Sequence, residues 1–428
     1  MAKVYAEAFG CSANFADYEM AAGLLREAGF QLVERPGESD LLMVFTCTVK
    51  TPTERKMIRR IRELQALAKP LIVAGCMPKV EEELIGEIAP KASLMGPDSV
   101  LKVVEVVEET LKGVRVRSLE DQRLPKTCLP RARLNPLVHI APISTGCLGN
   151  CSYCIVKFAR GRLFSYPLEA IVEDASRAVS SGAKEIWVTA EDTGAYASED
   201  ARLPDLLKSL CALEGRFYIR VGMMTPNAAL SMLGDLVEAF SEEKVFKFLH
   251  VPVQSGNDEV LKRMNRRYSV EDFRRLVARF REEMPEMSLS TDIICGFPGE
   301  TEEQFRDSLR LVEEVKPDIV NISRFGSRPG TEAAKMRPQI PGWETKRMSR
   351  LLSQRWRSLS AERNRQWVGW DGEVLIDEKG RGDSWVGRNY AYKTVVLRGG
   401  ARLGDFLQVR IVDARPQYLL GEPLDHGS

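Results

Sequence analysis

The chain has 428 residues, 44% of them hydrophobic and 28% charged, and its formal net charge is +1. This composition is typical of a folded globular protein with two or three domains and argues against a disordered chain. The balanced charge excludes a global electrostatic signature of nucleic-acid binding but leaves room for a local basic patch. Met1–Gly10 has no apolar secretory segment and no later apolar run has the length of a membrane span, so we expect a cytoplasmic protein with no membrane partner.

Residues 1–115 alternate short apolar segments with amphipathic ones. This alternation predicts an open, mostly parallel α/β sheet with helices on both faces. The expected strands are Lys3–Phe9, Leu41–Thr46 and Leu71–Gly75, and the clearest helices are Asp17–Ala28 and Glu54–Ala68. Residues 116–137 are polar and contain several prolines, a composition typical of a linker.

The alternation resumes over residues 138–368, where about six strand–helix units predict a full or partial (β/α) barrel. Periodicity alone does not distinguish such a barrel from a doubly wound sheet. The expected strands are His139–Ser144, Glu185–Thr189, Phe217–Val221, Phe246–Val253, Leu289–Cys295 and Asp318–Ser323. A long basic helix is expected over Glu344–Gln366. Residues 369–428 then change to short alternating segments with glycine turns, which are typical of a small antiparallel β-barrel.

Three of the nine cysteines form a tight cluster, Cys147, Cys151 and Cys154, in a Cys-x₃-Cys-x₂-Cys run after an expected strand. Structural disulfides are rare in the cytosol, so metal ligation is favoured. Three thiolates can hold three irons of a four-iron cluster, leaving the fourth iron open to chelate S-adenosylmethionine (SAM). A structural zinc site is the alternative. It would need a fourth ligand nearby, and the closest candidate, His139, lies within an expected strand.

This motif resembles that of the radical SAM superfamily, which carries SAM contacts at the ends of later strands. The corresponding residues here are Glu191 and Asp192 in Thr189–Asp192, Gln254 in Val251–Gly256, and Gly296 in Asp292–Thr301. The resemblance implies that they bind SAM. Ordinary strand–turn–helix punctuation is the alternative for each stretch. Many members have Gln-Asn or Gln-Asp where this chain has Glu191-Asp192, which leaves the roles at that strand end open.

Three further cysteines, Cys11, Cys47 and Cys76, each follow the end of an expected strand in the first region. In a parallel sheet these ends lie on one edge, where loops converge at a topological switch point. The three thiolates could therefore hold a second cluster with an open iron. The alternative is that they are small buried hydrophobic residues, as free cysteines usually are.

The combined pattern resembles the methylthiotransferase family of radical SAM enzymes over essentially the whole chain. The segments that carry the resemblance are Ala8–Asn14, Thr46–Thr48, Gly75–Pro78, Gly146–Cys154, Pro252–Asn257 and Gly296–Thr301. The resemblance implies two [4Fe-4S] clusters, SAM, an electron-donor protein and a C-terminal TRAM domain over residues 369–428. In the family, the second cluster donates a sulfur that carries a methyl group from another SAM.

Residues 10–25 and 157–172 look most like the archaeal and eukaryotic branch of this family. That branch methylthiolates C2 of N6-threonylcarbamoyladenosine at position 37 of tRNA, so the implied partner is the tRNA anticodon stem-loop. N6-isopentenyladenosine in tRNA and an aspartate of a ribosomal protein are the alternative substrates. A non-catalytic RNA-binding or cluster-carrier protein is a further alternative, against which the intact triad of Cys147, Cys151 and Cys154 counts.

The tail interleaves basic and aromatic residues, which is typical of small RNA-binding β-barrels. Arg388 and Arg398 flank Tyr390 and Tyr392 and are the predicted phosphate contacts. The other residues of this set are Arg381, Trp385, Lys393, Arg402 and Arg410, and the preceding helix adds Lys346, Arg347, Arg350, Arg355, Arg357, Arg363 and Arg365. A solvated basic helix and an ordinary barrel surface are the alternative.

Overall fold

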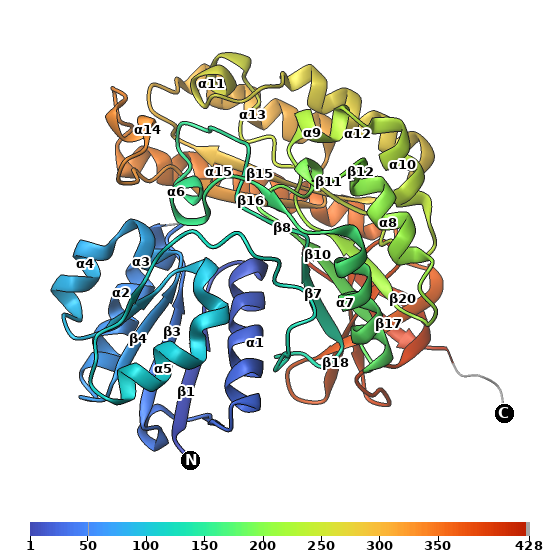
Figure 1. Ribbon diagram of the computed structural model, residues 1–428. Coiled ribbons are helices and arrows are strands. Elements are labelled where there is room, and N and C mark those ends of the chain that lie inside the picture. The colour runs from blue at the N-terminus through green and yellow to red at the C-terminus, as the bar shows by residue number, and fades with distance from the viewer. Residues whose placement is uncertain (50, 425–428) are drawn as a thin grey trace.

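The computed structural model describes residues 1–49 and 51–424 as three packed regions (Figure 1). The first is a parallel sheet in the order β2-β1-β3-β4-β5-β6. Its strands are β1 (Lys3–Ala8), β2 (Gln31–Val33), β3 (Leu41–Thr46), β4 (Leu71–Gly75), β5 (Ser93–Met95) and β6 (Arg117–Ser118). The predicted open parallel sheet is confirmed.

Helices cover both faces of this sheet because its central strands are apolar on both sides. The strand β3 is buried at every position, and its alternate residues enter two separate cores. One core contains α1 (Ser12–Glu27) and α5 (Val103–Leu111), and the other contains α2 (Thr51–Gln65) and α4 (Glu82–Ile88). A short helix, α3 (Met77–Val80), follows β4 directly.

The stretch 116–137, expected to be a linker, is tied closely to both neighbouring regions. Its first residues form β6, at the edge of the N-terminal sheet. Farther along, the Lys126 ammonium is buried and bonds to Asp17 Oδ1 at 2.7 Å and to the Pro97 carbonyl at 2.8 Å. Arg131 bonds to Asp174 at 3.1 Å, so the stretch fixes the first region against the second.

The second region is a partial barrel of six parallel strands, in two three-stranded sheets that the Ile219–Val245 bridge joins. Its strands are β7 (Val138–Pro142), β10 (Glu185–Thr189), β13 (Tyr218–Val221), β14 (Phe248–His250), β15 (Ser288–Cys295) and β16 (Ile319–Arg324). The strand order ends at β7 and β16 without pairing them, so the described barrel is open. Helix α1 packs against β7, and Val138 and Ile140 join the N-terminal core, so the N-terminal region borders the barrel there.

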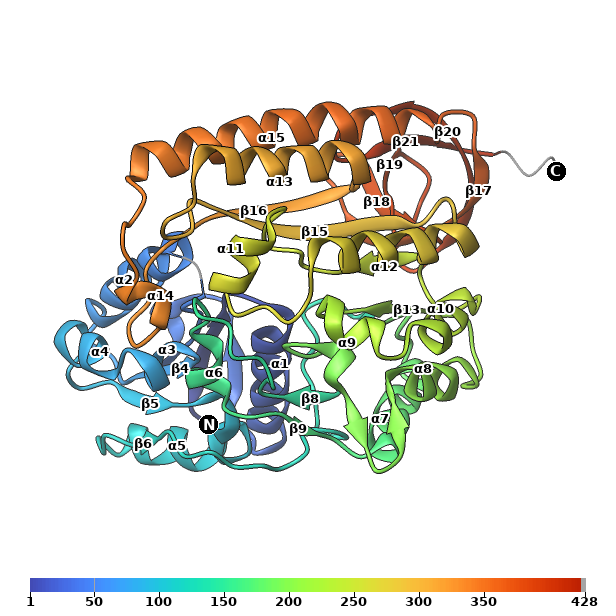
Figure 2. The ribbon, with the colours of Figure 1, turned by 90° about the horizontal axis from the view of Figure 1, so that it is seen from above.

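Helices and short elements connect these strands and cover the outside of the barrel (Figure 2). The long helices are α7 (Leu168–Ser180), α8 (Leu203–Cys211), α10 (Leu233–Ser241), α12 (Val270–Glu283), α13 (Glu302–Val315) and α15 (Gly342–Arg365). The short elements are β8 (Ser144–Thr145), α6 (Val156–Arg160), β9 (Phe164–Ser165), β11 (Ala197–Ser198), β12 (Ala201–Arg202), α9 (Pro226–Leu230), α11 (Asp258–Arg263) and α14 (Glu332–Lys335). Three 3₁₀ turns occupy Pro36–Glu38, Pro97–Lys102 and Thr193–Ala195.

The third region is a closed five-stranded barrel in the order β17-β18-β19-β21-β20. The predicted small barrel is confirmed, but β19 and β21 are paired in parallel, so it is not wholly antiparallel. Its strands are β17 (Asp371–Lys379), β18 (Ser384–Asn389), β19 (Thr394–Arg398), β20 (Phe406–Ala414) and β21 (Leu419–Pro423). The small barrel packs on the larger one through Tyr392, whose ring lies 4.8 Å from that of Phe246 and 5.0 Å from that of Phe248, centroid to centroid. Among the described residues, no helix has the length and apolar character needed to cross a membrane.

Candidate active site

The Cys147–Cys154 loop is held by a small β-ladder and by the segment that follows α11. Ser144 and Thr145 pair with Ser165 and Phe164, which closes the loop at its base. Farther along, the Ser152 amide donates to the Met264 carbonyl at 3.0 Å, and the Asn265 side chain donates to the Asn150 carbonyl at 2.7 Å. These contacts fix the loop at the carboxyl end of β7, as expected from the sequence.

The three thiols of this loop lie close enough for each to affect the charge state of another. Burial, together with the charges of Asp192, Cys154 and Cys151, raises the pKa of Cys147 to about 12. The amide of Gly149, which donates to Cys147 Sγ at 3.2 Å, acts in the opposite direction. Arg266 Nη1 donates to Cys151 Sγ at 3.0 Å. Amide and guanidinium donors aimed at sulfur stabilise thiolates, which are the form that binds iron.

Glu191 and Asp192 follow β10, but they face different neighbours. Asp192 lies beside Cys147, and its carboxylate accepts bonds from the Thr225 amide at 2.9 Å and the Thr225 hydroxyl at 2.7 Å. Glu191 Oε1 instead lies 3.2 Å from Nε of Arg160. The other oxygen, Oε2, is buried and has no hydrogen-bond partner among the described residues, so it can accept a bond from a ligand.

Gln254 and Gly296 follow β14 and β15, in backbone conformations with positive φ of 71° and 74°. The backbone of Gln254 is bonded to β15: its N–H donates to the Asp292 carbonyl at 2.7 Å, and its carbonyl accepts from the Ile294 N–H at 3.0 Å. A Cβ on Gly296 would lie 2.2 Å from Thr345 Cγ2, so packing against α15 already explains the glycine. The SAM contact expected at Gly296 stays a prediction.

The N-terminal cysteines converge at the carboxyl edge of their sheet. Cys11, Cys47 and Cys76 follow β1, β3 and β4, which are neighbours, and the strand order reverses between β1 and β3. A Cβ on Gly10 would lie 3.1 Å from Cys47 Sγ, which shows how close the first and second loops are. This is the topological switch point, where open α/β sheets bind their ligands.

Burial keeps two of these thiols protonated in the metal-free protein. Cys47 and Cys76 are only 6% and 4% exposed. Burial raises the pKa of Cys47 and raises that of Cys76 to about 12, and the charge of Cys11 raises both, whereas Arg160 lowers both. Both triads are therefore groups of mutually close thiols beside an arginine.

The donor sets fit four-iron clusters better than single ions. Within the described residues, no three Cys, His, Asp or Glu side chains form a set that could hold one metal ion. A four-iron cluster does not need ligands that converge on one point, because each of three thiolates binds a different iron. Each triad could supply three cysteines to such a cluster and would leave the fourth iron open, which fits the expected SAM site at Cys147, Cys151 and Cys154.

Arg160 and Arg266 are site residues that the sequence did not single out. Both are arginines close to cysteine sulfur, and Arg160 is only 4% exposed. Their contacts have no local signature, because their partners come from other parts of the chain. The one available signal for Arg160 is its position shortly after Cys154, at the end of α6.

The small barrel separates the predicted RNA-contact residues into two groups. The prediction for Arg388 is corrected, because its guanidinium bonds to Asp377 at 3.1 Å and stacks over Tyr392 at 5.1 Å, inside the contact with the larger barrel. Lys393 is also buried there, on Asp318 at 2.6 Å. The exposed basic residues whose side chains have no partner within the described part of the chain are Arg381, Arg398 and Arg402. Arg381 and Arg402 lie between strands of the barrel, and Arg398 ends β19, where it pairs with Ser384, the neighbour of Trp385 in β18.

Family models match all three regions of the chain. They are described as "Radical SAM superfamily" over residues 141–312, "Uncharacterized protein family UPF0004" over residues 3–96 and "TRAM domain" over residues 366–424. Among solved structures, the fold is similar to that of the radical SAM methyltransferase TsrM from Kitasatospora setae. The TM-score is 0.59, at 15% identity, over 78% of this chain and 75% of that one. The fold and the cysteine motif thus define a radical SAM enzyme.

Curated relatives narrow the class further. A protein of Pyrococcus horikoshii named "Probable threonylcarbamoyladenosine tRNA methylthiotransferase" is 44% identical over 99% of both chains. The Homo sapiens "Threonylcarbamoyladenosine tRNA methylthiotransferase" is 37% identical over 99% of this chain and 74% of its own length. The chain belongs to this methylthiotransferase family, as its sequence motifs predicted.

Proposed function

We propose that this enzyme adds a methylthio group to C2 of N6-threonylcarbamoyladenosine at position 37 of tRNA, using two [4Fe-4S] clusters and SAM. The observation that carries the proposal is the convergence of Cys11, Cys47 and Cys76 on an edge that adjoins the barrel loop of Cys147–Cys154. An enzyme that only cleaves SAM needs one triad. The second, built triad supports a sulfur-transfer function, and the names of the relatives support the substrate.

When bound, the cofactors supply an electron that splits SAM into methionine and a 5′-deoxyadenosyl radical, and a sulfur that receives a methyl group. The chain's own residues hold and shield these groups. The amide of Gly149 and the guanidinium of Arg266 stabilise the thiolates of the barrel triad. Glu191 Oε2 and the Asp192 carboxylate are the proposed acceptors for the amino group of SAM, with Gln254 and Gly296 as further contacts.

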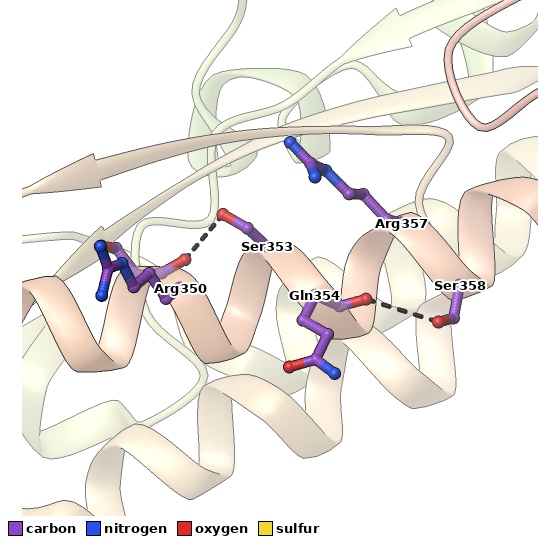
Figure 3. A pocket seen from close by; sticks show the side chains of 6 residues that line it. Arg350, Ser353, Gln354, Arg357 and Ser358 are labelled. Atoms are coloured by element: carbon purple, nitrogen blue, oxygen red, sulfur yellow. Dashed lines mark hydrogen bonds between the residues drawn. The ribbon is translucent and has the colours of Figure 1, made fainter.

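Two exposed basic surfaces are the proposed contacts for the anticodon stem-loop. The first consists of Arg381, Arg398 and Arg402 on the small barrel. The second lies on the outer face of α15, where Ser349, Arg350, Ser353, Gln354, Arg357 and Ser358 line an open hollow (Figure 3). Arg350 and Arg357 have no side-chain partner among the described residues, whereas Arg347, Arg355 and Arg363 on the same helix are paired with acids. Unpaired arginines on an exposed helix suit phosphate groups.

The proposed substrate also sets the expected compartment and partners. Cytoplasmic tRNA would place the enzyme in the cytoplasm, and the electron would come from a donor protein that the chain does not identify. N6-isopentenyladenosine and a ribosomal-protein aspartate are the competing substrates. The names of the curated relatives favour the threonylcarbamoyl nucleoside over both.

Mass spectrometry of tRNA nucleosides tests the substrate. The reconstituted enzyme would be incubated anaerobically with SAM, reductant and either of two tRNA pools, one with and one without N6-threonylcarbamoyladenosine. We expect the methylthio product only from the first pool. Product on isopentenyladenosine instead, or none on either tRNA while 5′-deoxyadenosine accumulates, would contradict the proposed substrate.

A further inference from the structure

Arg160 lies where the two cysteine triads approach each other. It ends α6, the helix that begins just after Cys154, and α6 packs against α3, the helix that begins just after Cys76. Its side chain is almost fully buried, with 4% of the residue exposed. Because a buried arginine keeps its charge, Arg160 places a permanent positive charge between the two sites.

Acids from both domains hold this guanidinium. Arg160 Nη2 donates to Asp17 Oδ2 at 2.9 Å, and Asp17 belongs to α1 of the N-terminal domain. Arg160 Nε lies 3.2 Å from Glu191 Oε1, at the end of the barrel strand β10. Asp17 is also bonded to Lys126 at 2.7 Å, so two cations and two carboxylates form a balanced buried set. Breaking one member leaves an uncompensated charge in a low-dielectric site.

The same guanidinium lies beside the N-terminal triad. Helix α3, on which α6 packs, begins directly after Cys76, and helix α1, which carries Asp17, begins directly after Cys11. A buried cation at this place favours added negative charge on iron and sulfur bound there, because charges near a cluster set its reduction potential.

We propose that Arg160 is a positioning residue of the N-terminal cluster: Asp17 and Glu191 clamp its guanidinium beside the triad, where its charge stabilises the reduced state of a cluster on Cys11, Cys47 and Cys76. This inference rests on the proposed function, since it needs the second cluster. It also gives Glu191 a second role beside the proposed SAM contact, because Oε1 holds Arg160 whereas Oε2 has no partner among the described residues.

A redox titration of the isolated N-terminal cluster tests the clamp. The full chain with Cys147, Cys151 and Cys154 changed to Ala would be reconstituted and reduced with dithionite, and its electron paramagnetic resonance signal followed against potential. Arg160→Gln removes the positive charge, so we expect a lower midpoint potential. Asp17→Asn removes an opposing negative charge, so we expect a higher one. Arg160→Lys keeps the charge, so its midpoint potential should lie closer to that of the protein with Arg160 than the midpoint potential of Arg160→Gln does.

Arg131→Gln is the matched control. Arg131 is also a buried arginine paired with an acid, Asp174 at 3.1 Å, but it faces neither triad. The Arg131→Gln substitution should lower thermal stability and leave the midpoint potential of the N-terminal cluster unchanged. If the midpoint potential shifts in the same direction for Arg160→Gln and Asp17→Asn, or shifts for neither, the proposed role of Arg160 is wrong, but the second cluster is not thereby excluded. If the background variant binds no iron although Arg160 is intact, the second cluster itself is refuted, and the inference falls with it.

Discussion

At the scale of single residues, Gly146 directly precedes Cys147 and has a φ of +76°. A Cβ there would lie 2.3 Å from the Arg162 carbonyl oxygen, across the base of the loop. Gly146→Ala should therefore move Cys147 and reduce the iron bound at the barrel triad. The left-handed backbone alone costs about 1–2 kcal/mol in a residue with a side chain, and the clash adds to this. Iron analysis and thermal unfolding of the variant measure both effects.

Gly182→Ala separates the clash from the backbone strain. Gly182 also has a positive φ, +95°, but a Cβ there would meet nothing within 4 Å. This variant should lose some stability and keep its full iron content. Equal iron loss in both variants would mean that the close approach at Gly146 does not hold the loop.

Glu300 gives the loop after β15 a dependence on pH. Its carboxyl accepts the amides of Gly296 at 2.6 Å and Phe297 at 3.2 Å, yet burial raises its pKa from 4.5 to about 7. The folded state thus holds a proton that the unfolded state releases, so this contribution to stability is full below pH 4.5 and is lost as pH rises to about 7.

Glu300→Gln should flatten this part of the pH profile, because the neutral amide keeps an acceptor for both amides and does not titrate. Denaturant unfolding at about pH 5 and about pH 8 compares the two proteins. An unchanged fall in unfolding free energy between these pH values in the variant would assign the dependence to other groups.

The cysteines could be predicted from the sequence because spacing and strand ends determine where they lie. The arginines could not, because their roles depend on contacts between regions far apart in the chain. Arg160 meets Asp17 of α1, and Arg388 lies under Tyr392, the residue that packs on Phe246 and Phe248 of the larger barrel. Alternation of charge and aromatic residues in the tail therefore predicted an RNA contact at Arg388 where the structure has a domain contact.

At the scale of elements, long apolar strands were the most predictable features. The strands β3, β4 and β10 have the expected bounds: β3 and β4 are buried at every position, and β10 is buried at all positions except Trp187. Helix α1 begins at Ser12, earlier than the expected Asp17, because Cys11 is extended and ends the preceding turn. The closing strand β21 was missed, since Leu419–Pro423 is short and ends in a proline.

The exposed turns of the small barrel should set the salt dependence of tRNA binding. Arg398 and Arg402 are exposed there, and their guanidinium groups have no partner among the described residues. Changing both to Ala should weaken binding, and removing each bond to a phosphate should reduce the slope of log affinity against log salt by roughly 0.7–0.9. Binding curves at several salt concentrations measure the slope.

Arg388→Ala is the comparison for this pair. The substitution leaves Asp377 buried without its cation, so thermal stability should fall while the salt slope stays unchanged. If Arg388→Ala reduced the slope of log affinity against log salt more than the Arg398 and Arg402 double variant does, the RNA contact would lie at Arg388. The division into exposed RNA-contact residues and buried domain-contact residues would then be wrong.

At the scale of the whole molecule, the partial barrel is bordered by both other regions. Helix α1 packs on β7, and the small barrel packs on Phe246 and Phe248 through Tyr392. Figure 1 shows the N-terminal sheet beside the barrel, with the loop that precedes α6 above it. The two cysteine triads therefore belong to separate domains that share one interface, and their chemistry should be separable by mutation.

The proposed division of labour is that the barrel triad cleaves SAM and the N-terminal triad delivers sulfur. The most direct test is the variant with Cys11, Cys47 and Cys76 changed to Ala, assayed together for iron, 5′-deoxyadenosine and methylthiolated tRNA. We expect about four irons in place of about eight, continued formation of 5′-deoxyadenosine, and no methylthio product. A variant that still installs the methylthio group, or that keeps all its iron, would contradict it.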